Sequence, residues 1–175
     1  MKKVIGTVEH AYSLFEKAAS SLQSPLLLAV RLYWGWQFFQ TGFGKLTSID
    51  KVVDFFTSLG IPFPAFNAYL IGSLECVGGI MLFLGLGSRI ISLPLTVNLL
   101  VAYITADREA LLSIFSDPEK FYAAAPYTFL FASLLVLVFG PGKFSLDFAI
   151  SYLRKRRVAG QNQLELSGVL AGQRE

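Results

Sequence analysis

Residues 67–105 read NAYLIGSLECVGGIMLFLGLGSRIISLPLTVNLLVAYIT. Two long apolar blocks, at about 67–87 and 89–105, fill this stretch, with the turn Gly87-Ser88-Arg89 between them. Each block is close to the roughly 20 residues that a helix needs to cross a bilayer. So short a turn predicts that the two helices are antiparallel neighbours.

Two further apolar blocks flank this pair, at about 25–43 and 126–140. Ser24-Pro25 opens the first as a helix cap with a first-turn proline, and Gly140-Pro141-Gly142 closes the last. Apolar residues make up 54% of the chain and charged residues 15%, whereas soluble domains average about 45–50% and about 25%. Four buried helices of a soluble protein would need more polar sequence to cover them. We therefore expect an all-α fold, a four-helix transmembrane bundle.

Amphipathic stretches lie outside the four blocks. Apolar residues recur at helical spacing from Ile49 to Leu59, and again from Val8 to Leu22. These patterns predict short interfacial helices. The chain then divides into an N-terminal amphipathic cytoplasmic segment (1–24), a membrane domain (25–157) and a polar cytoplasmic tail (158–175) that is expected to be disordered.

Basic residues indicate the orientation of the chain in the bilayer. The N-terminal segment, the 87–89 turn and the C-terminal segment carry ten Lys and Arg residues, against four in the two loops on the other side. The positive-inside rule places both termini in the cytoplasm, and the expected location is the cytoplasmic membrane. Charges at Glu9, His10, Glu16 and Lys17 interrupt any cleavable signal sequence, so the first membrane segment is expected to stay in the mature protein.

Composition also excludes several kinds of site. The formal net charge of +3, without a basic stripe, argues against nucleic acid as a partner. Cys76 is the one cysteine and His10 the one histidine, so one chain cannot build a disulfide, a CxxC pair or a Cys/His metal site. We expect no metal and no built-in cofactor.

Two ionisable residues, Arg31 and Glu75, fall inside apolar blocks. A charge at the centre of a membrane helix costs about 2.5–3.5 kcal/mol on insertion scales, so such residues face the bundle interior and find partners. With their polar neighbours they define a candidate ligand-binding or buried polar cluster: Arg31, Gln37, Gln40, Lys45, Glu75 and Asn98.

Small residues share helix faces with these polar groups on the first two membrane helices. Glycines let two membrane helices approach closely, which replaces the missing hydrophobic drive for association. The two faces are therefore predicted to pack against each other, with Gly35 and Gly42 on the first helix and Gly78 or Gly79, together with Gly85, on the second.

The partner of Glu75 stays open at this stage. With the inner helix ends aligned, Gln37 lies at the depth of Glu75, whereas Arg31 lies roughly 9 Å closer to the cytoplasm. An Arg31–Glu75 pair requires another register, and the alternative for Arg31 is to extend toward the headgroups. Glu75 is then either a neutral acid that bonds Gln37 or Gln40 and sets helix register, or part of a mid-membrane ligand-binding or proton-handling site.

Taken in order, several of these pieces resemble the DoxX family of small membrane proteins, over about residues 25–150. They are the face from Arg31 to Lys45-Leu46, Gly60-Ile61-Pro62, the face from Glu75 to Gly85-Leu86, and the run from Gly140 to Asp147. The resemblance implies a four-helix protein of the bacterial cytoplasmic membrane. It also implies a link to thiosulfate:quinone oxidoreduction, or to sulfur and thiol redox complexes with soluble partners.

Two functions follow as hypotheses. The first is the membrane subunit of a quinone- or sulfur/thiol-linked redox complex, an oxidoreductase subunit that acts with a soluble partner and binds a quinone near Glu75, Gln40 and Arg31. The alternative is a non-enzymatic scaffold or small-solute carrier, alone or as a homo-oligomer, whose polar residues serve helix packing or solute passage. The residues identify neither the substrate nor the partner.

Overall fold

The computed structural model of this chain describes residues 2–172, with side chains described for residues 9, 10 and 12–161. Over these residues the protein is all-helical, as predicted, and contains no strand. The side chain of Val8 and residues 173–175 of the predicted tail lie outside the described part. The eight helices are α1 (Lys2–Thr47), α2 (Ile49–Ser58), α3 (Pro64–Leu84), α4 (Ser88–Thr105), α5 (Arg108–Leu112), α6 (Pro118–Ala123), α7 (Pro126–Phe139) and α8 (Leu146–Gly172).

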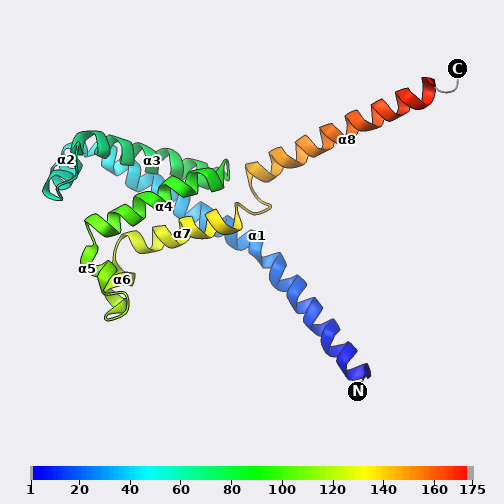
Figure 1. The fold of residues 1–175 in the computed structure, drawn as a ribbon, viewed down its shortest axis with the longest axis horizontal. Helices are drawn as coiled ribbons and strands as arrows, with labels where there is room; N and C mark the ends of the chain where they lie inside the picture. The colour runs from blue at the N-terminus through cyan, green and yellow to red at the C-terminus, as the bar shows by residue number, and fades with distance from the viewer. Residues whose placement is uncertain (1, 173–175) are drawn as a thin grey trace.

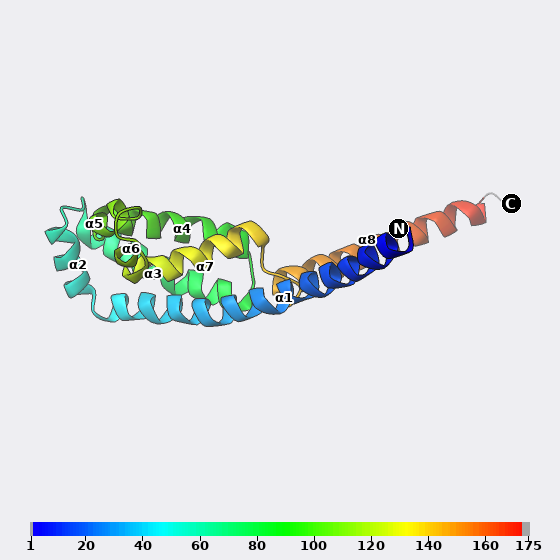
Figure 2. The same ribbon diagram turned by 90° about the horizontal axis from the view of Figure 1, so that it is seen from below.

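Helices α1, α3, α4 and α7 pack side by side (Figure 1). Contacts join α1 to α3, α3 to α4, α4 to α7 and α7 back to α1, so the four close into a ring. Helices α2, α5 and α6 lie at one end, while the N-terminal half of α1 and all of α8 project from the other (Figure 2). The end that carries α2 is called the α2 end below, and the opposite one the terminal end.

Two helices, α3 and α4, are long and apolar enough to cross a membrane, and α7 is apolar but has 14 residues. Their limits follow from local chemistry. Pro64 and Pro126 occupy first-turn positions, where a missing N–H costs nothing. Gly85 ends α3 with a positive φ of 72°, a backbone conformation that glycine adopts without strain.

The contact between α1 and α3 is the closest in the bundle. A Cβ placed on Gly42 would lie 2.3 Å from the backbone nitrogen of Cys76, and one on Gly79 would lie 2.4 Å from that of Phe39. Gly35 is similarly close to the Phe83 backbone. Backbone meets backbone along this line, so the predicted packing of the two glycine faces sets the spacing of α1 and α3.

The two remaining predicted glycines have other neighbours. Gly78 lies on the α4 side of α3, where an added Cβ would meet Leu95. Gly85 lies beyond the end of α3, against the guanidinium of Arg31. Of the two alternatives, Gly79 and not Gly78 therefore lies at the α1–α3 contact, and Gly85 meets α1 through the Arg31 side chain and not through its backbone.

The chain ends differ from expectation. The predicted start at Pro25 is wrong, because α1 runs through this proline without a break; an interior proline removes one hydrogen bond, and the rest of the helix can carry that loss. The tail expected to be disordered from residue 158 is helical to Gly172. Residues 158–172 contain no proline, and eight of the fifteen are Ala, Leu, Gln or Glu, which favour helix, although three are glycines.

Candidate ligand-binding site

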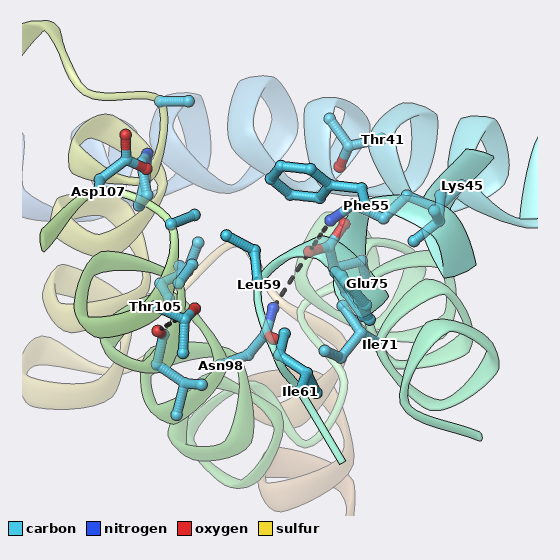
Figure 3. Close-up of a pocket in the computed structure, with 18 of the residues that line it drawn as sticks. Thr41, Lys45, Phe55, Leu59, Ile61, Ile71, Glu75, Asn98, Thr105 and Asp107 are labelled. Atoms are coloured by element: carbon cyan, nitrogen blue, oxygen red, sulfur yellow. Dashed lines mark hydrogen bonds and ion pairs between the residues drawn. The ribbon is translucent and has the colours of Figure 1, made fainter. Parts of the chain in front are cut away.

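Lys45, Glu75 and Asn98 meet between α1, α3 and α4 (Figure 3). The Lys45 ammonium donates to Oε1 of Glu75 at 2.5 Å, and Nδ2 of Asn98 donates to the same oxygen at 3.1 Å. The Glu75 side chain is 5% exposed and the Lys45 side chain 33%. The site is thus a nearly buried carboxylate that has one ammonium and one amide as partners.

Packing of the helices brings these three residues together. Gly42 lies against Gly72 and Cys76, so the next turn of α1, which carries Lys45, faces Glu75. Asn98 comes from the middle of α4, which also packs against α3. The charged pair therefore depends on the close glycine contact of α1 and α3.

The second carboxylate oxygen of Glu75 is different. Oε2 is buried and has no hydrogen-bond partner among the residues that the structure describes. Buried polar atoms are nearly always satisfied, and an exception calls for a ligand, a water or an ion. Oε2 of Glu75 is thus a buried acceptor without a partner in the described part of the chain.

Glu75 lines a cavity of about 500 Å³ at the α2 end of the bundle. Helix α2 covers it: Phe56 is buried, and Val52 and Leu59 line the same wall. Most of the other walls are apolar. Lys45 and Asn98 lie beside Glu75, whereas Thr105 and Asp107 lie on the opposite side of the cavity (Figure 3). Further lining residues are Phe38, Thr41, Lys45, Ser48, Lys51, Phe55, Ile61, Ile71, Asn98, Leu99, Val101, Ala102, Thr105, Ala106, Asp107, Ala125, Pro126 and Phe129.

The structure brings together only half of the predicted polar cluster. Gln37 donates to the Tyr33 hydroxyl on its own helix, and Gln40 is exposed. The predicted bond from Glu75 to either glutamine is replaced by bonds from Lys45 and Asn98. The reason is register: α1 extends past the end of α3, so Glu75 lies beside the α2-end part of α1 and not beside its middle.

Arg31 lies far from Glu75, at the terminal end. It is fully buried, and NH2 donates to the Phe144 carbonyl at 2.5 Å. The alternative that Arg31 extends to the headgroups is therefore wrong. Its Nε and NH1 have no hydrogen-bond partner in the described part of the chain, and NH1 lies where a Gly85 side chain would stand. No space for a ligand is left there.

Asp147 joins the same region and was not among the predicted site residues. Its carboxylate accepts from the backbone N–H groups of Gly87 at 2.8 Å and Ser88 at 3.1 Å, at the start of α4. The Asp147 N–H in turn donates to the Gly85 carbonyl. The sequence did mark Asp147, because this residue ends the run from Gly140 by which the chain resembles its family. Its hydrogen-bond partners lie more than 50 positions away along the chain, so the run itself does not indicate them.

Replacing Asp147 with alanine is expected to lower the free energy of unfolding by about 2 kcal/mol, because two backbone donors at the start of α4 lose a charged acceptor. An SDS unfolding titration in mixed micelles measures this loss. Asp54→Ala, on the exposed side of α2, is the control. Equal stability of the two variants would show that Asp147 does not hold the 87–88 turn.

The residues of α2 that close the cavity were predicted only as an interfacial helix. The spacing of Val52, Phe56 and Leu59 is what an apolar face needs, but it does not say what that face covers.

Over the described residues, no group of three or more His, Cys, Asp or Glu side chains could hold a metal ion.

Comparison with known proteins gives three findings. The DoxX family model matches residues 26–108. A Bacillus subtilis protein named "Putative oxidoreductase CatD" is 31% identical over 120 residues, 69% of this chain and 83% of that protein. An uncharacterized membrane protein of Mycobacterium tuberculosis is 31% identical over 134 residues, 73% of this chain and 82% of that protein. No solved structure matches the chain.

Proposed function

This chain belongs to the DoxX family, and from that premise we propose that it is a membrane-embedded subunit of a redox complex whose helical bundle binds a quinone. The observation that carries the proposal is the cavity beside Glu75, with mostly apolar walls in which the polar groups of Lys45, Glu75 and Asn98 meet. A quinone has the same division, because its carbonyl oxygens are polar while its ring substituents and tail are not.

Exposed side chains support a place in the bilayer. Large apolar residues face outward on the bundle helices, among them Trp36, Phe43, Ile90, Val97 and Phe131. Contiguous apolar surface of this kind marks a lipid or partner contact. Helices α3 and α4 have spanning length, the 25–43 part of α1 is similarly apolar, and α7 covers about 21 Å at 1.5 Å per residue. We propose that together they make four crossings, of which α7 is shorter than the hydrocarbon core of about 30 Å.

The arrangement of the chain ends supports the orientation. The two termini project beyond the same end of the bundle, and the α3–α4 turn lies at that end (Figures 1 and 2). The basic-rich segments therefore share one side, and we place it in the cytoplasm of a bacterial cell by the positive-inside rule. The cavity then opens near the outer half of the membrane.

The polar groups suit a quinone carbonyl. Lys45 and Asn98 each donate one hydrogen bond to Glu75. An ammonium and an amide have further hydrogens to donate. A ring that enters along the apolar walls places one oxygen beside these donors. The walls contributed by α2 and α4, with Phe55 and Val101, lie against the ring or its tail.

Reduction of a quinone takes two electrons and two protons, and a soluble enzyme partner is proposed to supply the electrons. This chain has a single cysteine and a single histidine, so it offers a membrane site for the acceptor and not a chain of redox centres. B. subtilis CatD, named as a putative oxidoreductase, is consistent with such a role.

Adding decylubiquinone or a short-tailed menaquinone analogue to the purified protein is expected to raise its Tm. A ligand at 100 times its Kd stabilises by about 2.7 kcal/mol, which corresponds to about 5–10 °C for a chain of this size. Glu75→Gln should weaken this shift, whereas Asp54→Asn, the same chemical change on an exposed carboxylate, should leave it intact. No shift with any quinone would favour a scaffold or solute carrier.

A further inference from the structure

We infer that the first three turns of α8, residues 146–157, bind anionic phospholipids at the inner leaflet of the membrane. Apolar side chains of this segment enter the boundary between headgroups and acyl chains, and basic side chains contact the negatively charged headgroups. The inference goes beyond the proposed quinone site and does not depend on what the cavity binds. It rests only on the placement of the bundle in a bilayer with its terminal end inside.

Helix α8 begins beside the α3–α4 turn and then leaves the bundle (Figures 1 and 2). Its first turn is fixed there, because the Asp147 carboxylate accepts from the N–H groups of Gly87 and Ser88. All residues from 148 to 161 are exposed. The α3–α4 turn joins two helices of spanning length, so α8 starts close to the level of the headgroups.

The first two turns of α8 carry apolar side chains on two faces. Leu146, Ile150 and Leu153 lie on one face at helical spacing, and Phe148 and Tyr152 lie on another. These five residues are between 43% and 59% exposed. Helices at a membrane boundary bury such side chains by about 5–10 Å, and aromatic residues are enriched at that depth. The terminal end of the bundle therefore continues into a segment that suits this boundary.

A basic cluster, Arg154 to Arg157, follows directly on the apolar turns. Four successive residues spread around the whole helix at 3.6 residues per turn, so basic groups face the membrane whichever side of α8 lies against it. Among the described side chains none of the four forms an ion pair, and Arg156 lies over the Tyr152 ring, 5.2 Å from its centroid. The one acid among the described side chains of α8, Asp147, is already bound at the start of α4. The four positive charges are therefore available to anions outside the chain.

The apolar turns favour lipid over an acidic protein as the occupant. An acidic protein surface complements the charges of residues 154–157 but leaves the apolar side chains before them in water. An anionic membrane offers both, since headgroup charges and acyl chains lie next to each other. Each Lys or Arg near such a surface strengthens binding about fivefold, and the effect fades within a Debye length of about 8 Å at physiological salt. High salt therefore separates headgroup binding from apolar contact alone.

The test is fluorescence quenching of the full chain in nanodiscs. Cys76→Ser removes the one cysteine, and Leu153→Cys introduces another on α8 for an NBD label. The nanodiscs contain equal amounts of phosphatidylglycerol and phosphatidylcholine, and a nitroxide is attached to the acyl chains of one lipid or of the other. Nitroxide-labelled phosphatidylglycerol is expected to quench at least about twice as strongly as labelled phosphatidylcholine, because anionic lipid gathers around the basic cluster. High salt should remove this difference, and so should glutamine at all four positions of residues 154–157.

An NBD label at Phe131→Cys in the same Cys76→Ser chain is the control. Phe131 is an exposed residue of α7 on the bundle, away from the basic cluster, so both lipids should quench it equally. Equal quenching by both lipids at residue 153 would overturn the inference, because apolar contact would then occur without recognition of anionic headgroups. No quenching at residue 153 with normal quenching at 131 would also overturn it and would leave α8 as a surface for an acidic protein. No quenching at residue 131 would overturn the placement of the bundle in the bilayer as well.

Discussion

Replacing Gly42 with alanine is expected to lower the free energy of unfolding by about 2–3 kcal/mol, a typical cost of overpacking a close contact. The added methyl would lie 2.3 Å from the Cys76 nitrogen and 2.7 Å from the Gly72 carbonyl oxygen. Both are backbone atoms, so the contact cannot relax by turning a side chain. The helices α1 and α3 must separate, which is measured as a fall in Tm and in the SDS midpoint.

Gly44→Ala is the matched control. It lies two residues away on α1, is exposed, and has nothing within 4 Å of an added Cβ. Alanine favours helix over glycine by up to about 1 kcal/mol, so this variant should be as stable as the wild type or slightly more stable. If both variants lost stability equally, the loss would come from helix propensity or the environment of α1, and the proposed backbone contact would be wrong.

Replacing Glu75 with leucine is expected to cost about 2–3 kcal/mol, because the Lys45 ammonium loses its counter-ion and Asn98 its acceptor. Breaking a fully buried ion pair costs about 3–5 kcal/mol, and Lys45 remains partly exposed, which lowers the penalty. The double variant Lys45→Met/Glu75→Leu should recover much of the loss, since no unpaired charge remains.

A double-mutant cycle over these variants separates the pair from other effects. The two single losses should exceed the loss in the double variant by more than 1 kcal/mol, as expected for residues in direct contact. Additive losses would mean that the ion pair contributes nothing to folding. The cycle also bears on function. If replacing the pair by apolar side chains costs little stability, folding gives no reason for an ion pair in the bundle interior.

Three of the four apolar blocks predicted helices of the bundle closely. Those at about 67–87, 89–105 and 126–140 became α3, α4 and α7, each with its limits shifted by three residues or fewer. These helix limits could be predicted because proline and glycine mark helix ends through local backbone geometry, which depends on few neighbours. The same rule failed at Pro25, where the helix continues because an interior proline removes only one hydrogen bond.

The candidate site was harder to predict. Arg31, Gln37, Gln40, Lys45, Glu75 and Asn98 were grouped because polar residues inside apolar helices seek one another, and the structure unites only Lys45, Glu75 and Asn98. Gln40 faces outward, and Arg31 finds the Phe144 carbonyl at the opposite end. Which polar residues meet depends on helix rotation and register, and composition carries no information on either.

Local sequence therefore determines the helices of this protein, their order and their small-residue faces, because each depends on residues a few positions apart. The offset between α1 and α3 is set only by packing in the folded chain. Sliding one glycine-lined helix by a turn keeps small residues in contact but changes every partner, and the choice among such registers is made by the sum of backbone contacts along the whole pair. That sum places Gly42 against Cys76, brings Lys45 to Glu75, and leaves one buried carboxylate oxygen without a partner among the described residues.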